Sequence, residues 1–207
     1  MLSKWFTTQR ERTTERPGFV SFDTTDQNGK VKREQVDLRE ASLMLIARQL
    51  TGVSSKLALA TQLTVLWLQN NALTEVPACV FGLCRLAVLQ LCSNRLKSLP
   101  SSVSLLTALT DLRVSQNSLT SLPSEIGTLP MLKALAVNQN HIVQLPDSLG
   151  ERAFRDATMQ WLTVSDHQSK KNASALHNSC AAQLNSAACP LIFLCASDCK
   201  ISTCRHS

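Results

Sequence analysis

A pattern of apolar and polar positions repeats along the middle of the chain. The stretch "LWLQNNALTEVP", residues 66–77, starts with alternating apolar residues, continues through two asparagines and ends with a proline. Neither helical spacing nor strict alternation describes the whole stretch. The same order of residues returns every 23 residues, in blocks at 63–85, 86–108, 109–131 and 132–153. The pattern therefore predicts a repeat with one structural unit per block.

Each block follows the consensus L-x-x-L-x-[LV]-x-x-N-x-[LI]-x-x-[LV]-P-x-x-[VIL]. Its first residues predict a short strand with leucines on one side, and four such strands stacked as a parallel sheet share a core. We expect the asparagine to satisfy backbone groups of the turn and to link to the next coil. We expect the proline to start the return path. The asparagine column is Asn71, Asn94, Asn117 and Asn140, and the proline column is Pro77, Pro100, Pro123 and Pro146.

With these columns the sequence resembles the leucine-rich-repeat family. It is similar to the 23-residue subclass with an L-P step, which is typical of intracellular Ras-pathway scaffolds, Scribble and Erbin type polarity scaffolds and plant Ras-group-related proteins. The resemblance is strong over residues 63–153. It implies an α/β solenoid: a curved, right-handed coil with a parallel sheet on the concave face and short helical, 3-10 or irregular segments on the convex face.

The repeat becomes irregular upstream of these blocks. Residues 43–62 keep the leucines but have Arg48 at the asparagine position and lack the L-P step. The polar flank before them, residues 1–36, contains Asn28-Gly29 between two partly alternating stretches, which predicts a hairpin over residues 19–38. We expect this hairpin to cap the open N-terminal edge of the sheet. Disorder is the alternative up to residue 18.

Downstream, the repeat also degenerates. We expect the next core positions at Phe154, Ala157 and Met159, and the next asparagine position at Leu162. The repeat domain is therefore predicted over 37–164, with degenerate coils at 43–62 and 154–164. We expect the Cys-rich tail at 165–207 to be weakly ordered, because it shows neither a repeat nor a clear period.

Composition and charge exclude several classes of function. The length of 207 residues suggests one domain with appendages. The net charge is +6, but the excess is spread thinly, so we expect no nucleic acid partner. The longest apolar run, residues 189–196, is too short to span a bilayer, and the N-terminus lacks the apolar segment of a secretory signal. We therefore expect a cytoplasmic protein with its eight cysteines reduced.

No set of residues predicts catalysis or a cofactor. A Gly-rich phosphate loop is missing from the sequence. The tail cysteines and His206 leave zinc binding open as an alternative, although their spacing departs from the close pairs of zinc sites. Cys195 with Asp198 resembles the site of bacterial leucine-rich-repeat ubiquitin ligases, but too few residues follow the repeats for the helical domain of those enzymes. We therefore expect no metal, no cofactor and no enzyme activity.

The remaining hypothesis is binding of another protein on the concave face. The column Met44, Trp67, Gln90, Arg113 and Ala136 runs down the middle of this face, and Trp and Arg are enriched at binding hot spots. The alternative for Trp67 is packing against the N-terminal flank. We predict a monomeric adaptor for intracellular signalling, or else a fragment or short isoform of a larger leucine-rich-repeat kinase or ubiquitin ligase. The predicted contact residues are Trp67, Gln69, Gln90, Asp111, Arg113 and Asn138.

Overall fold

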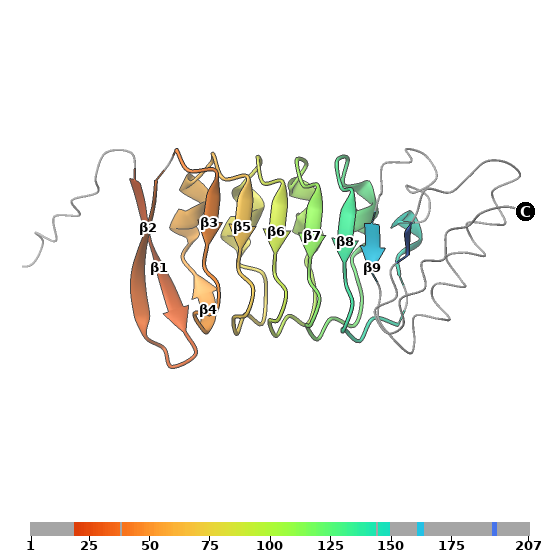
Figure 1. Cartoon of the computed structure of the whole chain (residues 1–207), viewed down its shortest axis with the longest axis horizontal. Coiled ribbons are helices and arrows are strands. Elements are labelled where there is room, and N and C mark those ends of the chain that lie inside the picture. The colour runs from red at the N-terminus through yellow and green to blue at the C-terminus, as the bar shows by residue number, and fades with distance from the viewer. Residues whose placement is uncertain (1–18, 38, 144, 150–160, 164–191, 194–207) are drawn as a thin grey trace, which may run out of the picture.

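Two sheets form the main elements of this computed structural model, which describes residues 19–37, 39–143, 145–149, 161–163 and 192–193. Seven short parallel strands form a row in the order β10-β9-β8-β7-β6-β5-β3, and a smaller sheet in the order β2-β1-β4 lies at its N-terminal end (Figure 1). The strands are β1 (Phe19–Asp26), β2 (Val31–Asp37), β3 (Ser42–Met44), β4 (Leu50–Val53), β5 (Val65–Trp67), β6 (Val88–Gln90), β7 (Asp111–Arg113), β8 (Ala134–Ala136), β9 (Trp161–Thr163) and β10 (Ile192–Phe193). The 3-10 helices are η1 (Ser55–Leu59), η2 (Ala78–Gly82), η3 (Ser101–Leu105) and η4 (Ser124–Thr128).

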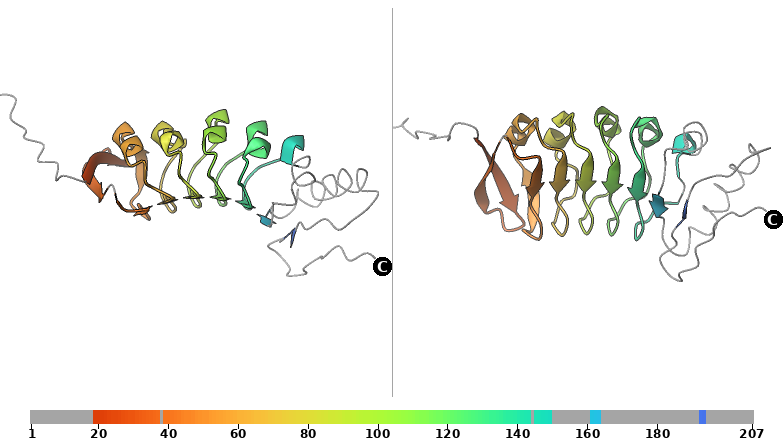
Figure 2. Two further views of the ribbon diagram at one scale, coloured as in Figure 1. Left: turned by 90° about the horizontal axis from the view of Figure 1, so that it is seen from above. Right: turned by 45° about the horizontal axis from the view of Figure 1, so that its top comes forward.

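The strands of the large sheet stack with one coil per block. Leu66 pairs with Leu89, Leu89 with Leu112, and Leu112 with Leu135, so equal positions of successive blocks lie side by side. Figure 2 shows the strands in one row and the 3-10 helices in a second row. The chain therefore has a solenoid-like fold with a parallel sheet on one side, termed the strand face below.

Leucines fill the space between the two rows. In the first regular coil Leu66, Leu68, Leu73 and Leu83 are all 0% exposed. Strand leucines alternate with outward-facing residues because successive side chains of a strand point to opposite faces. Burial of one leucine side chain contributes about 2 kcal/mol, and the same positions are buried in the following coils. The stacked leucines are therefore the main source of stability.

The return paths begin with 3-10 helices whose N-cap is a proline in the regular coils. Pro77, Pro100 and Pro123 precede η2, η3 and η4. Ser54 holds this position in the first coil, and its backbone N–H donates to Asp23 O of β1 at 2.8 Å. Proline has no N–H to donate. Contact with β1 therefore explains why the L-P step is missing from the first coil.

The column asparagines lie in the turns that follow the strands. The Oδ1 of Asn94 accepts from Leu73 N at 3.1 Å, and its Nδ2 donates to Leu68 O at 2.9 Å and to Leu91 O at 3.0 Å. Leu68 and Leu73 belong to the preceding coil, so the link runs backward along the chain, not to the next coil as the sequence suggested. The same contacts with their own neighbours are made by Asn71, Asn117 and Asn140.

The N-terminal flank forms a hairpin of β1 and β2. The expectation that it covers the edge of the large sheet is wrong, because β1 pairs with β4 in the return path of the first coil. Among the described residues, β3 has only β5 as a neighbour. Phe22 and Val36 of the hairpin join the core, each at 1% exposure. The hairpin thus covers the end of the core from the side of the return path.

An ion-pair cluster joins this hairpin to the first coil. Glu34 of β2 contacts Arg48, which stands at the asparagine position, and also Lys32 Nζ at 3.2 Å. Burial acts to raise the pKa of Glu34, but the hydrogen bonds and charges of Arg48 and Lys32 together outweigh it and leave this pKa below the ordinary value of 4.5. A carboxyl whose pKa is lower in the folded state than in the unfolded state stabilises the fold at pH values above its unfolded-state pKa. This contribution is lost as the pH falls through the folded-state pKa.

We expect Glu34→Gln to lower the free energy of unfolding by about 1 kcal/mol at pH 7. The variant should also lose less stability than the wild type on acidification below pH 4.5. Urea unfolding at several pH values measures both effects. Asp23→Asn is the control, since its pair with Arg33 is more exposed. Equal loss of stability in acid for wild type and Glu34→Gln would contradict the assigned role of the cluster.

The C-terminal end of the row departs from the predicted spacing. Leu162 of β9 pairs with Leu135 of β8 and therefore occupies the position of a strand leucine. The prediction that Leu162 occupies the asparagine position is wrong. The return path between these strands is longer than in the regular coils, which shifts the register. Phe154, Ala157 and Met159 lie outside the described residues. In the tail that was predicted to be weakly ordered, β10 lies in the apolar run of residues 189–196 and pairs with β9 in parallel.

The last described return path has a different helix type. Residues 147–149 are α-helical where the preceding coils have a 3-10 helix, and an α-helical turn is wider than a 3-10 turn. Ser148 lies so close to η4 that a Cβ added to Gly127 would be 2.4 Å from the Ser148 carbonyl carbon. The Ser148 hydroxyl donates to Ser124 O at 2.6 Å. Glycine at position 127 permits this close approach.

Candidate functional site

The strand face is built from columns of side chains that the sheet register brings side by side. Neighbouring strands align Met44 with Trp67, Trp67 with Gln90, Gln90 with Arg113, and Arg113 with Ala136. Their neighbours two residues earlier form a parallel column of Ser42, Val65, Val88, Asp111 and Ala134. These columns are outward-facing because the intervening leucines point into the core. The face is therefore continuous across the described coils.

The N-terminal half of this face is apolar. Met44 is 54% exposed, and Trp67 beside it is partly buried, as are Val65 and Val88. The hairpin contacts β4 and η1, which lie away from this face. Trp67 thus presents part of its ring to solvent next to an exposed methionine, and this group of four residues is termed the apolar patch below.

One ion pair lies next to the apolar patch. The Nε of Arg113 donates to both carboxylate oxygens of Asp111 at 3.1 Å, and its NH2 group donates to Oδ2 at 2.8 Å. This hydrogen bond raises the pKa of Arg113 above its ordinary value. Residues i and i+2 of one strand lie on the same face, so the strand itself sets the geometry. Arg113 remains half exposed, with N–H groups that are available to a partner.

A polar row follows the strands on the same face. It consists of Gln69, Cys92, Ser115 and Asn138, and Ser115 donates a hydrogen bond to Asn138. Burial raises the pKa of the Cys92 thiol, which therefore stays protonated at neutral pH. Cys92 is free, as are Cys79 and Cys84, the other cysteines within the described ranges. The row offers neutral hydrogen-bonding groups rather than a reactive thiolate.

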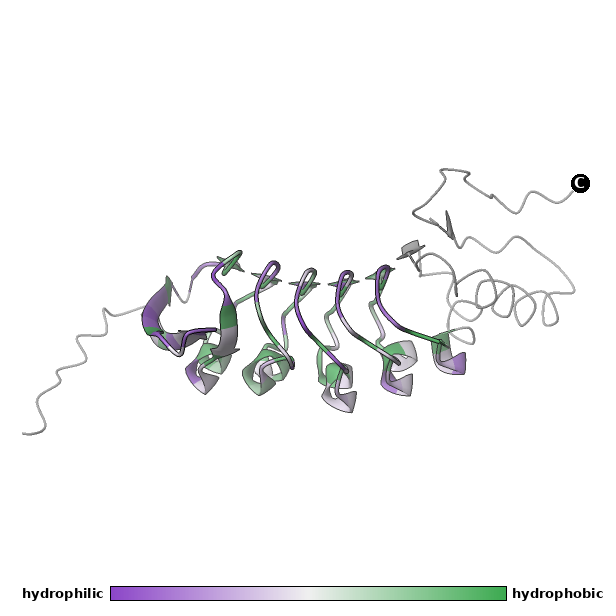
Figure 3. Ribbon diagram, turned by 90° about the horizontal axis from the view of Figure 1, so that it is seen from below, coloured by the Kyte–Doolittle hydropathy of each residue, from purple (hydrophilic) through white to green (hydrophobic). Residues whose placement is uncertain are grey.

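The next residue of each coil has a left-handed backbone. The left-handed conformation reverses the direction of the chain, so that the following asparagine enters the turn. The left-handed residue itself lies at the rim of the strand face. Asn70 is exposed whereas Asn71 is buried, which separates the roles of the two adjacent asparagines. The turns appear hydrophilic in Figure 3. The residues with a positive φ angle at this position of the coil are Ala47, Asn70, Ser93, Gln116 and Gln139.

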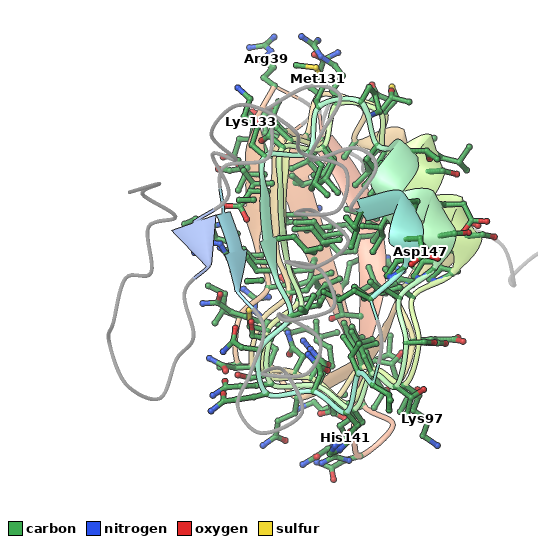
Figure 4. All side chains as sticks on the ribbon, turned by 90° about the vertical axis from the view of Figure 1, so that its right-hand side faces the viewer. Arg39, Lys97, Met131, Lys133, His141 and Asp147 are labelled. Atoms are coloured by element: carbon green, nitrogen blue, oxygen red, sulfur yellow. The ribbon has the colours of Figure 1, made fainter. Side chains whose placement is uncertain are left out.

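Charged side chains lie mainly at the two edges of the strand face. Figure 4 places Arg39 and Lys133 at the edge where the strands begin and His141 at the opposite edge, with Lys97 further round on the side of the return paths. Between these edges, the outward positions of β3 and β5 to β8 carry Asp111 and Arg113 as their charged residues. Since these two are paired, the strand face has no net charge.

Within the described ranges, no group of three or more His, Cys, Asp or Glu side chains is arranged to hold a metal ion. The tail cysteines and His206 considered for zinc lie outside these ranges. The described part of the chain contains no helix with the length and apolar character needed to cross a bilayer.

A family model and several solved structures are similar to parts of this chain. Residues 84–142 match the family model described as leucine rich repeat. The search of curated proteins gave no match. Among solved structures, a leucine-rich-repeat protein of Leptospira interrogans is similar at 25% identity with a TM-score of 0.58. The match covers 74% of this chain, which spans only 36% of the Leptospira protein.

Two plant structures show weaker similarity. The leucine-rich-repeat ectodomain of the receptor kinase SOBIR1 from Arabidopsis thaliana has 26% identity and a TM-score of 0.47, over 66% of this chain and 74% of that one. The complex of BIR3 and SERK2 from Arabidopsis thaliana has 27% identity and a TM-score of 0.47, over 66% of this chain and 71% of that one. The family match and the Leptospira structure together support a leucine-rich-repeat protein, with its repeats in the stacked coils described above.

Proposed function

We propose that this chain is a non-catalytic, cytoplasmic adaptor that binds another protein on its strand face. The observation that carries the proposal is the partly buried Trp67 beside the exposed Met44 in the apolar patch, on a continuous face of leucine-rich repeats. Stacked repeats of this kind provide extended binding surfaces. The 23-residue spacing, shared with intracellular scaffolds, supports a role in signalling.

The face is preorganised for binding. The asparagine contacts fix each turn, and the strand register fixes the spacing of the columns. A rigid surface loses little conformational freedom when a partner binds, so more of the contact energy appears as affinity. Trp67 supplies an apolar anchor, and two strands further along the same column Asp111 holds the Arg113 guanidinium in place. This combination is typical of the few residues that dominate a binding interface.

The charge of the face indicates the chemistry of the partner. Its paired Asp111 and Arg113 leave no excess positive charge to attract a nucleic acid backbone. A partner segment with an apolar side chain for the Trp67 patch and neutral hydrogen-bond acceptors for Arg113 fits best. We therefore expect binding that changes little with salt concentration.

We expect the double variant Trp67→Ala with Arg113→Ala to lose the partner, with a loss of about 2 kcal/mol or more in binding free energy. Capture from lysate followed by quantitative mass spectrometry identifies the bound proteins, and titration of the recovered partner gives its Kd. The matched control is Leu105→Ala with Lys97→Ala, which changes an exposed apolar and a basic residue away from the strand face. A folded strand-face variant that keeps every partner at wild-type affinity would refute the proposal.

A further inference from the structure

One asparagine of the chain stands directly before a glycine. Asn28-Gly29 is the only such pair in the sequence, and it lies at the tip of the hairpin between β1 and β2. An asparagine side chain can react with the backbone nitrogen of the next residue to form a cyclic imide. Glycine favours this reaction because it has no side chain to hinder the approach. The hairpin tip thus combines the most reactive sequence for this chemistry with an accessible loop.

The hairpin turn is held by its backbone and by the carboxylate of Asp26. Gly29 N donates to Asp26 O at 3.0 Å. Asp26 Oδ1 accepts from Asn28 N and from Lys30 N, both at 2.9 Å. Gly29 has the positive φ of 74° that a three-residue loop with a bulge requires. None of these contacts uses the Asn28 side chain, which is exposed and has no hydrogen-bond partner among the described residues.

The column asparagines have a protection that Asn28 lacks. Asn117 also precedes a small residue, Ser118, but it is only 8% exposed. Its Nδ2 donates to Leu91 O at 3.0 Å, and its Oδ1 accepts from Leu96 N at 3.0 Å. An amide that is held at both atoms cannot turn toward the next backbone nitrogen. The exposed amide of Asn28 has no such restraint, so the fold separates the two sites by reactivity.

One contact of the turn opposes the reaction. The hydrogen bond from Gly29 N to Asp26 O must open before the nitrogen can attack. Residues 27–30 are all exposed, so water can take the place of the carbonyl acceptor, and loop tips open at the lowest cost in a native protein. A Cβ added to Gly29 would meet no atom within 4 Å outside its chain neighbours, so the approaching amide has room. The turn therefore slows the reaction without preventing it.

We propose that Asn28-Gly29 is a modification site, at which the folded chain loses ammonia and converts to isoaspartate. The backbone nitrogen of Gly29 gives up its proton and attacks Cγ of Asn28. The new N–Cγ bond forms as the Cγ–Nδ2 bond breaks, and the amide nitrogen leaves with that proton as ammonia. Water then opens the imide at either of its two carbonyl groups, which gives aspartate or isoaspartate. Water is the only co-reactant, and no atom changes its oxidation state.

Isoaspartate changes the cap of the first coil. It adds a methylene group to the backbone between residues 28 and 29 and places a new carboxylate near that of Asp26, so the turn loses the length and charge that close it. Gln27 N donates to Gln49 O at 2.8 Å, which ties this turn to the first coil. Phe22 and Val36 of the same hairpin lie in the core. The modified chain therefore loses stability at its N-terminal end, whatever the strand face binds.

Incubation of the full chain in mildly alkaline buffer, with and without urea, tests the proposal. Peptide mapping with electron-transfer fragmentation distinguishes asparagine, aspartate and isoaspartate at each site. We expect folding to slow the conversion of Asn28 by less than about tenfold, whereas Asn117 should convert in urea alone. Asn28→Gln should stay intact in both buffers, because its longer side chain forms the corresponding ring far more slowly. Slowing of Asn28 beyond this limit, to the level of Asn117, overturns the modification site.

The effect on the cap is measured on the isoaspartate form after its separation by ion exchange. Its unfolding midpoint in urea should shift below that of the unmodified chain. Asn28→Asp is the matched control, since it adds the same charge without the extra backbone atom, and it should unfold closer to the unmodified chain. An isoaspartate form that unfolds together with Asn28→Asp overturns the role assigned to the longer backbone. Neither measurement involves a binding partner, so failure here leaves the proposed function of the strand face untouched.

Discussion

Replacement of Asn94 by leucine is expected to lower the free energy of unfolding by about 2–3 kcal/mol. The substitution removes the acceptor for Leu73 N and the donor to Leu68 O and Leu91 O. These backbone groups lie in a turn where Asn94 itself is only 9% exposed, so water replaces the lost partners poorly. Chemical unfolding followed by circular dichroism measures the loss.

Asn140→Leu provides a matched control for this prediction. Asn140 makes the same contacts with Leu119 N, Val114 O and Val137 O, but it is more exposed than Asn94. Water can therefore reach part of the vacated site, and we expect roughly half the loss seen at Asn94. A melting temperature unchanged in Asn94→Leu would show that the amide contacts contribute little.

Gly127→Ala is expected to destabilise the chain by about 2–3 kcal/mol through steric overlap. The new Cβ would lie 2.4 Å from both the carbonyl carbon and the Oγ of Ser148. Because the carbonyl carbon belongs to the backbone, a change of rotamer at Ser148 cannot relieve the contact, and the helical residues 147–149 must move away from η4. The hydrogen bond from Ser148 Oγ to Ser124 O is then lost as well.

Gly82→Ala separates this overlap from the general effect of replacing glycine. A Cβ at Gly82 would approach only the Cβ of Ala58, at 3.3 Å, which a small movement can accommodate. We expect a change within about 1 kcal/mol for this variant. Equal destabilisation by the two alanine substitutions would argue against the close approach of η4 and residues 147–149.

The repeat explains why much of the sheet was predictable. A fixed spacing of 23 residues places equal positions of successive coils side by side, so the column through Trp67 and Arg113 follows from counting along the sequence. The alternation within each strand separates core leucines from outward residues in the same way. The periodicity does not identify the molecule that binds to this column, because the binding partner is not encoded in the repeat.

The ends of the stack could not be read from the repeat, because there the structure departs from it. The N-terminal hairpin was suggested by Asn28-Gly29, but its pairing with β4 rests on tertiary contacts such as Ser54 N with Asp23 O. Leu162 was misplaced because a longer return path shifts the register before β9. Coordinates were also required to find that β3 has a single neighbour among the described residues and that Arg113 forms an ion pair within its own strand.

The backward direction of the asparagine contacts has a consequence for synthesis of the chain. The partners of Asn94 lie at positions 68, 73 and 91, all of which precede it in the sequence. When the ribosome has added Asn94, the groups that it binds have already been made, and the same holds for Asn117 and Asn140. Each coil can therefore lock onto a finished one as it leaves the ribosome, from the N-terminus onward. Loss of coils from the C-terminal end leaves every earlier asparagine satisfied, whereas loss from the N-terminal end deprives the first remaining one of its partners.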